Sequence, residues 1–307
     1  MKVLITGGGG FIGAWVARQL LLEGVRPRVM ELGEDRSLLE DVLGRGASGI
    51  DWISGDVSRC ADLESALSGC DRVIHLAGAL GPICQTDPAR AAEINYIGTL
   101  HLLALASERA MPVVYASTAL VHAEDGGETV TPGGHYGIFK LASELSAHVY
   151  AKSHGLSSMG IRPPVVYGYG RTAGNSAGLS LACRAAARGE AYTIPMSGMI
   201  EAIFVDDVAS AFVRAVLEPC AGAHVANLIG DRISLDDFRD TIRTVVPEAR
   251  IQCRGQMHSI ASVRPGRDIR ELFPGMPKTT LSDGIAATIR LHRNGVPDVT
   301  GKGAEAT

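Results

Sequence analysis

The sequence predicts an α/β fold, in which a doubly wound parallel sheet is followed by a smaller mixed α/β lobe. Three observations lead to this expectation. Apolar, strand-like segments alternate with helix-period segments as far as residue 162, and the first strand runs directly into a glycine cluster. After Pro163-Pro164 the alternation stops, and a less regular, glycine- and tyrosine-rich segment follows. Apolar strands that alternate with helices are typical of a parallel sheet covered on both faces.

The same patterns place the individual elements. After a first strand that ends at Thr6, we expect strands at residues 28–32, 50–53, 72–76, 112–117 and 157–162, with long helices at 89–106 and 136–153. In the second half we expect helices at 177–188, 206–217, 235–245 and 281–291, and short strands at 192–194, 202–205 and 225–229. Ligands of such sheets bind at the carboxyl ends of the strands.

Composition excludes several classes of function. The 307 residues are 46% hydrophobic and carry a net charge of −4, without a basic run that would suit nucleic acid or an anionic membrane. We expect a small-molecule partner. No apolar run is long enough to span a bilayer, and the chain opens on its first strand, so we expect no signal peptide. Six scattered cysteines without Cys-x-x-Cys spacing suggest reduced thiols in the cytoplasm, and nine histidines without His-x-x-x-His spacing favour no metal.

The glycine cluster predicts a dinucleotide site. Gly7, Gly10 and Gly13 stand three residues apart, between a strand and a helix. In this setting the first glycine permits a tight turn, the second lets a pyrophosphate approach the backbone, and the third lets helix and strand pack closely. The helix N-terminus offers free N–H groups to the phosphates. The alternative is a flexible glycine loop.

Two acidic residues bear on the cofactor. Glu31 ends the second strand, about 20 residues after the glycine turn, where a carboxylate accepts hydrogen bonds from the ribose diol. It would repel a 2′-phosphate, which favours NAD over NADP, although the nearby Arg36 could reverse that preference. Asp56, after the third strand, could accept from the adenine amine; its alternative role is the N-cap of a helix that begins near Ser58.

A tyrosine and a lysine predict the chemistry. Tyr136 and Lys140 are four residues apart on a predicted helix and therefore share one face. A buried ammonium beside a phenol favours the phenolate, so we expect Lys140 to lower the pKa of Tyr136 from its usual value of about 10. Ser117 and Thr118 end the fifth strand at the same edge of the sheet, and Thr118 could bond the substrate oxygen. The alternative for both hydroxyls is turn chemistry.

Several motifs occur together in one order. They are TGGGGFIG at 6–13, GDV at 55–57, HLAG at 75–78, NYIGT at 95–99, AST at 116–118, YGIFK at 136–140 and RPPVVYG at 162–168, with VDDVA at 205–209 and RPGRD at 264–268 in the second lobe. As a set they resemble the extended short-chain dehydrogenases/reductases, the NAD-dependent epimerase/dehydratase family. The resemblance covers nearly the whole chain and is specific for fold and cofactor much more than for substrate.

The resemblance implies a role for each matching residue. Tyr136 would be the catalytic acid/base, Lys140 its partner and a ribose ligand, and Thr118 the residue that orients the substrate. Cofactor-binding residues would be Gly7, Gly10, Phe11, Ile12, Gly13, Glu31, Asp56, Val57, Leu76, Ala77, Gly78, Asn95 and Pro163, together with Tyr136 and Lys140. A Rossmann-type domain at 1–163 would bind NAD and carry the catalytic residues, 164–300 would be mainly the substrate lobe, and 301–307 a flexible tail. The Tyr136 helix would pair with its symmetry mate in a homodimer.

Departures from the family narrow the reaction. Ala119 and Leu120 stand where family dehydratases carry Asp-Glu, so dehydration is not expected. Ile200 and its neighbours stand where nucleotide-sugar epimerases often carry an arginine, and Glu201 would oppose a diphosphate. We therefore expect a sugar, sugar acid or similar polyhydroxylated substrate. Further candidates for substrate contact are Tyr167, Arg171, Asn175 and Arg264, of which Arg171 could meet a carboxylate or be a solvated loop residue and Arg264 could pair with Asp268.

These observations predict an NAD-dependent oxidoreductase of a secondary alcohol, with Tyr136 as acid/base. The alternative is an NAD-dependent sugar or nucleotide-sugar epimerase with a transient keto intermediate, which needs the same residues. A catalytically silent NAD-binding regulatory protein is the third possibility.

Overall fold

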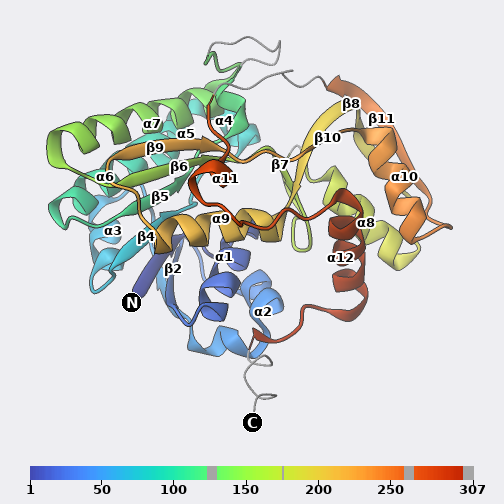
Figure 1. Cartoon of the computed structure of the whole chain (residues 1–307), viewed down its shortest axis with the longest axis horizontal. Coiled ribbons are helices and arrows are strands. Elements are labelled where there is room, and N and C mark those ends of the chain that lie inside the picture. Colours follow the sequence, from blue (N-terminus) through green and yellow to red (C-terminus); the bar gives the residue numbers. More distant parts are fainter. Residues whose placement is uncertain (123–129, 175, 259–265, 300–307) are drawn as a thin grey trace.

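The computed structural model describes residues 1–122, 130–174, 176–258 and 266–299. Figure 1 shows a large sheet with helices on both faces and, beside it, a smaller lobe formed by later parts of the chain. This confirms the predicted Rossmann-type sheet with a mixed C-terminal lobe. The division of the chain at residue 163 stays a prediction.

The large sheet is parallel throughout. Within the described residues its strands are β1 (Lys2–Thr6), β2 (Arg26–Glu31), β3 (Asp51–Ser54), β4 (Arg72–His75), β5 (Val113–Ala116), β6 (Ser158–Arg162) and β9 (Ala223–Asn227). They lie in the order β3-β2-β1-β4-β5-β6-β9, with parallel register between all neighbours. The strand order reverses between β1 and β4, and in open α/β sheets this switch point is where a ligand binds.

Two hydrophobic cores hold the helices against the sheet. One face is covered by α1 (Phe11–Leu22), α2 (Ser37–Leu43) and α9 (Val205–Leu217), whose buried side chains join a core that continues into the second lobe. The other face is covered by α3 (Cys60–Leu67), α6 (Gly98–Glu108) and α7 (His135–His154). The predicted helix at 89–106 divides into α5 (Pro88–Ala92), a π-helical turn at Glu93–Ile97, and α6. The short helix α4 (Gly81–Thr86) precedes it.

The last strand of the large sheet comes from the second half of the chain. Register pairs join Ser158 to Ala223 and Arg162 to Asn227, so β9 lies along the outer edge of β6. Helix α9, which leads to β9, packs on α1, and Gln19 on α1 donates to Asp206 on α9 at 2.7 Å. The chain therefore leaves the large sheet after β6, builds part of the smaller lobe, and returns.

The smaller lobe is built around one long strand. Here β8 (Tyr192–Phe204) pairs with β7 (Val165–Tyr167), β10 (Asp231–Ser234) and β11 (Ile251–His258). The helices α8 (Gly178–Arg188), α10 (Leu235–Val245) and α12 (Leu281–Asn294) belong to this lobe, and α11 (Ile269–Leu272) follows β11. The expectation of two separate strands at 192–194 and 202–205 is wrong. A register shift in β11 between Cys253 and Gln256 lies where Gly255 crosses Pro195, so β8 continues past its proline.

Membrane spans, disulfides and metal clusters are missing from the described residues. In the parts of the chain that the structure describes, no helix is both long and apolar enough to cross a membrane. All six cysteines lie in those parts and none is in a disulfide. No group of three or more potential metal ligands gathers among the residues described.

Candidate active site

The glycine turn has the geometry that a dinucleotide requires. Gly7 has a φ of +70°, and a Cβ there would lie 2.7 Å from the backbone nitrogen of Ala77. A Cβ on Gly13 would lie 2.3 Å from the carbonyl oxygen of Gly7, so this glycine allows helix and strand to meet. A Cβ on Gly10 would meet only that same oxygen, at 3.3 Å. The three positions thus match the turn, the close packing and the open approach for a pyrophosphate.

Helix α1 begins directly after this turn. It starts at Phe11, its N-cap residue Gly10 has no side chain that could cap it, and Ala14 N–H donates to the Gly10 carbonyl at 2.9 Å. The amides of Phe11, Ile12 and Gly13 are thus the orphan donors of a helix N-terminus, where a phosphate is stabilised by hydrogen bonds and by the helix dipole.

Glu31 reaches back to the same turn. Its carboxylate accepts from Gly9 N–H at 3.2 Å through one oxygen and from Leu32 N–H at 3.1 Å through the other. The Arg36 guanidinium lies 4.8 Å from the centre of the Trp52 ring, beside this site. A carboxylate in this place suits the ribose diol of NAD, and Arg36 is not paired with it.

Asp56 is engaged by its own surroundings. One carboxylate oxygen accepts from the amide and hydroxyl of Ser58, at 2.8 and 2.7 Å, and the other accepts from Arg90 at 2.5 Å. Helix α3 has Arg59 at its N-cap, so Asp56 closes a turn before the helix rather than capping it. Contact with adenine therefore stays a prediction for Asp56, and likewise for the buried Val57 next to it.

The segment after β4 is clamped by Asn95. The side-chain amide of Asn95 accepts from Ala79 N–H and donates to Ala79 O, both at 3.0 Å. A Cβ on Gly78 would lie 2.7 Å from Asn95 Oδ1, and Ala77 N–H donates to Thr6 Oγ1 at 3.3 Å. Asn95 belongs to the π-helical turn, a feature often found at functional sites. Residues 76–78 are thereby fixed beside the glycine turn, as a wall of the predicted cofactor trough requires.

His75 links these pieces and was missed by the sequence reasoning. Its Nδ1 lies 2.7 Å from Thr6 Oγ1 and its Nε2 lies 3.2 Å from Thr99 Oγ1. Because Thr99 donates its proton to Asn95 O, it accepts from His75, which makes His75 the Nε2–H tautomer. Burial, aided by the charge of Lys140, lowers the pKa of His75 to about 3. A neutral imidazole thus joins the glycine turn to the turn that carries Asn95.

The predicted catalytic residues come together at the carboxyl edge of the sheet. Tyr136 and Lys140 lie one turn apart on α7, with Nζ 5.8 Å from the centre of the phenol ring. The same Nζ would lie 3.6 Å from a Cβ on Gly78, which places it at the end of β4.

Thr118 follows β5, and its oxygen accepts from Leu120 N–H at 3.2 Å, which leaves the hydroxyl proton for a substrate. Ala119 N–H donates to Pro163 O at 3.1 Å, so Pro163 lies beside this loop.

The pKa of Tyr136 differs from the expectation. Burial of the phenol raises its pKa to about 12, and the nearby Arg171 opposes this only in part. Burial also lowers the pKa of the Lys140 ammonium to about 8. Desolvation is the largest influence on both pKa values, so Tyr136 rests as a neutral phenol and Lys140 as a cation near neutral pH.

A buried ion pair, also missed, fixes α7 to the sheet. Glu144 lies one turn after Lys140 and binds Arg162 at the end of β6, with distances of 2.8 and 2.6 Å to its two oxygens. Ser117 donates to the same carboxylate, beside Thr118. The spacing of Tyr136, Lys140 and Glu144 at every fourth position was the available signal. The pair holds the catalytic helix against the strand ends that carry its partners.

The residues predicted to contact the substrate lie in different surroundings. Tyr167 is on β7 and lies in the core of the second lobe, where its ring contacts Phe204 and Phe238. Asn175 and Arg264 lie outside the described residues. Arg171 is partly buried rather than freely solvated: burial lowers its pKa to about 10, and its guanidinium carbon lies 5.9 Å from the centre of the Phe11 ring.

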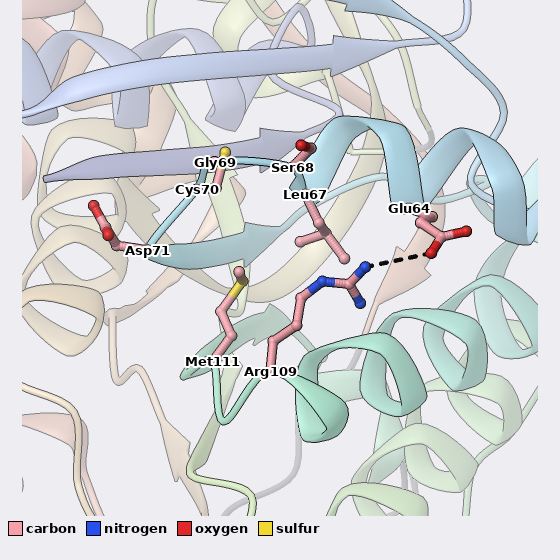
Figure 2. Close-up of a pocket in the computed structure, with 8 residues that line it drawn as sticks. All are labelled: Glu64, Leu67, Ser68, Gly69, Cys70, Asp71, Arg109 and Met111. Atoms are coloured by element: carbon pink, nitrogen blue, oxygen red, sulfur yellow. Dashed lines mark ion pairs between the residues drawn. The ribbon is translucent and has the colours of Figure 1, made fainter.

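A pocket lies at the opposite edge of the large sheet, where the amino ends of the strands meet. Figure 2 shows its lining, which comes from the segments that precede β4 and β5, including Cys70, Asp71 and Met111. Its volume is about 570 Å³, and Arg109 pairs with Glu64 across it at 3.6 Å. Because it adjoins the amino ends of these strands, it is separate from the site around Tyr136.

Comparison with known proteins agrees with this geometry. A family model described as the NAD dependent epimerase/dehydratase family matches residues 3–229. The chain belongs to this family. A full-length relative is the UDP-glucose 4-epimerase of Mycolicibacterium smegmatis, 27% identical over 96% of this chain and 99% of that protein. Short-chain dehydrogenase/reductase family 42E member 1 of Mus musculus is 29% identical over 69% of this chain and 57% of that protein.

Solved structures of the family share the fold. The Thermus thermophilus UDP-glucose 4-epimerase in complex with NAD has a TM-score of 0.78 at 23% identity, covering 96% of this chain and 99% of that one. MoeE5 in complex with UDP-glucose and NAD has a TM-score of 0.79 at 23% identity, covering 95% and 99%. The cofactor of this enzyme family is NAD, and the glycine turn, Glu31 and the Tyr136–Lys140 pair of this chain fit that cofactor.

Proposed function

We propose that this protein is an NAD-dependent epimerase of a sugar or nucleotide sugar, which inverts a secondary alcohol through a transient ketone. The observation that supports the proposal is that Thr118, Tyr136 and Lys140 lie at the carboxyl ends of the strands, where Lys140 Nζ adjoins Gly78 of the predicted cofactor site. The dehydrogenase reading needs the same residues, but the full-length relative is named as a UDP-glucose 4-epimerase. The epimerase is therefore the better supported of the two.

Each residue has a defined task in this reaction. NAD held by the glycine turn and Lys140 would supply the acceptor for a hydride from the alcohol carbon and the donor that restores it on the other face of the ketone. Tyr136 exchanges the hydroxyl proton, and Thr118 donates a hydrogen bond to the same oxygen. The ammonium of Lys140 stabilises the phenolate that Tyr136 forms when it acts as base. Ala119 and Leu120 follow Thr118 and carry no acid or base, so dehydration is not part of the proposal.

The C-terminal lobe does not oppose a nucleotide sugar. The Glu201 carboxylate, expected to repel a diphosphate, is buried and accepts from Gly230 N–H at 2.9 Å. Ile200, at the position where an arginine was sought, is 4% exposed and packs in the core. Glu201 therefore gives no reason to expect repulsion of a substrate diphosphate. The test includes UDP-sugars as well as free sugars and sugar acids.

The test follows one hydrogen. UDP-glucose labelled with deuterium at C4 is incubated with the enzyme, alongside a panel of other sugars, and products are followed by NMR. An epimerase gives the inverted sugar with deuterium retained and no net NADH. Steady accumulation of NADH with a ketone product would establish the dehydrogenase instead. Binding of NAD without conversion of any candidate would favour a silent binding protein.

We also propose that the protein forms a homodimer through α7. This helix lies on the outside of the molecule in Figure 1, and Ile138, Leu145 and Val149 on it are 47%, 62% and 59% exposed. Exposed apolar residues on one helix suit a second copy of the same surface. Light scattering after size exclusion should give a dimer for the wild type and a monomer for Leu145→Glu. A wild-type monomer at micromolar concentration would contradict this. The cytoplasmic location stays a prediction.

A further inference from the structure

A loop of the second lobe lies over the glycine turn. It leaves β7 at Gly168 and is anchored at three points on the NAD-binding domain. Trp15 of α1 donates to Tyr169 O at 3.1 Å. A Cβ on Gly170 would lie 2.6 Å from Leu38 of α2, and one on Gly174 would lie 3.5 Å from Leu80, which follows β4. Gly170 and Gly174 have φ of +94° and +92°, so this path depends on glycine.

Arg171 projects from this loop to the start of α1. Its guanidinium carbon lies 5.9 Å from the centre of the Phe11 ring. Its Nη1 donates to Val166 O, and its Nη2 donates to Ser176 Oγ at 2.9 Å. A guanidinium has five N–H donors, so these two bonds hold the group in place and leave donors for a ligand.

The charge of Arg171 has no counter-charge in the described part of the chain. None of the ion pairs among the described residues includes Arg171. The ionisable side chain that acts on Arg171 is Tyr136, a neutral phenol at rest, and the cation Lys140 lies on the same helix as Tyr136, with Nζ 5.8 Å from the centre of its ring. Two cations withdrawn from water beside one neutral phenol are costly unless an anion joins them.

We propose that Arg171 binds the pyrophosphate of NAD from the side of the C-terminal lobe, opposite the N-terminus of α1. The orphan amides of Phe11, Ile12 and Gly13 would hold the phosphates from one side, and the planar guanidinium would hold them from the other. Arginine is suited to this because its paired N–H groups match phosphate oxygens. The cofactor would then join the two lobes. A carboxylate or phosphate of the substrate is the competing ligand for the same cation.

The test measures binding and needs no substrate, so it stands apart from the proposed epimerase activity. Calorimetry with NAD and ADP-ribose, and displacement by adenosine, are compared for the wild type, Arg171→Gln, Arg171→Lys and the control Arg214→Gln. Arg214 is half exposed on α9 and pairs with Glu218 at 2.9 Å. We expect Arg171→Gln to weaken NAD and ADP-ribose about ten- to a hundredfold, as for loss of a bond to a charged group. Adenosine, which has no phosphate, should bind unchanged.

The other outcomes are also decisive. Arg171→Lys keeps the positive charge but lacks the paired N–H groups of the guanidinium, so it should lose less affinity for NAD and ADP-ribose than Arg171→Gln does. Arg214→Gln should bind both ligands as the wild type does. ADP-ribose affinity that is unchanged in Arg171→Gln would overturn the proposal, and a loss confined to substrate KM would assign the cation to the substrate. An equal loss for adenosine would also overturn it. If thermal unfolding without ligand shows that Arg171→Gln does not fold, Arg171→Lys decides alone: unchanged ADP-ribose affinity defeats the proposal.

Discussion

Glu144 on α7 and Arg162 at the end of β6 form a bidentate ion pair, with the side chains 4% and 10% exposed. Removing one partner strands a buried charge, whereas removing both does not. We expect Glu144→Gln to lower the free energy of unfolding by about 3–5 kcal/mol. The double variant Glu144→Met with Arg162→Met should be more stable than the single one. Urea unfolding measures both, and equal losses would show that the charges are not coupled.

Tyr136→Phe tests the acid/base assignment. Loss of the hydroxyl removes proton transfer, so turnover should fall by about a hundred- to ten-thousandfold. The rest of the trough is untouched, so NAD affinity measured by calorimetry should stay within about twofold. The mechanism fails if this variant keeps full activity.

Glu31 is predicted to set the choice of cofactor. Its carboxylate sits on the glycine turn through Gly9 N–H, where the ribose diol is expected. Glu31→Ala should narrow the preference for NAD over NADP by about 1–3 kcal/mol. Glu34→Gln is the matched control, since its side chain is 72% exposed and pairs with Arg36 instead. A wild-type enzyme that prefers NADP would refute the assignment.

Gly13 tests the packing of the turn. An alanine there would place its Cβ 2.3 Å from the Gly7 carbonyl oxygen, so the turn must shift. We expect Gly13→Ala to lose NAD binding and about 1–3 kcal/mol of stability. Gly49→Ala, where a Cβ would meet nothing within 4 Å, should stay within about 0.5 kcal/mol of the wild type. Calorimetry and urea unfolding of the two variants give the comparison.

His75 makes stability depend on pH. The pKa of His75 is about 3 in the folded protein, against an ordinary value of 6.5 in the unfolded chain. Between these two pH values only the unfolded chain binds a proton on this imidazole. Stability from this group is therefore full above pH 6.5 and is lost toward pH 3, by up to about 1.4 kcal/mol per pH unit. His75→Gln should flatten the decline in unfolding free energy between pH 7 and 5. Identical slopes would mean that His75 protonates freely in the folded protein.

The parts of the site that sequence could predict are those carried by local spacing. The glycine turn and the Tyr136–Lys140 pair are each contained within a few residues, and their side chains or backbones meet because a turn or a helix dictates it. The parts that it could not predict depend on contacts between distant segments. His75 forms hydrogen bonds with Thr6 and Thr99, which are 69 and 24 residues away in the sequence. Separations of this size do not indicate a contact.

Burial explains the remaining differences. The pKa of Tyr136 moved opposite to expectation because the charge of Lys140 was visible in the sequence and the desolvation of the phenol was not. Tyr167 was expected to contact the substrate and lies in the core. The sequence of a three-residue strand does not show which of its side chains face the core. Two short strands were expected at 192–194 and 202–205, but a register shift near Gly255 of the neighbouring strand lets β8 run through Pro195 as one strand.

The return of the chain to the large sheet has a consequence for synthesis on the ribosome. Strand β6 is complete when residue 162 emerges, but its outer partner β9 ends only at Asn227. In that interval the nascent protein exposes an unpaired edge and the apolar side of α1 that α9 later covers. Such an edge invites pairing with other chains. We expect a fragment ending at 163 to aggregate, and chaperone contact during translation to peak before residue 227 appears.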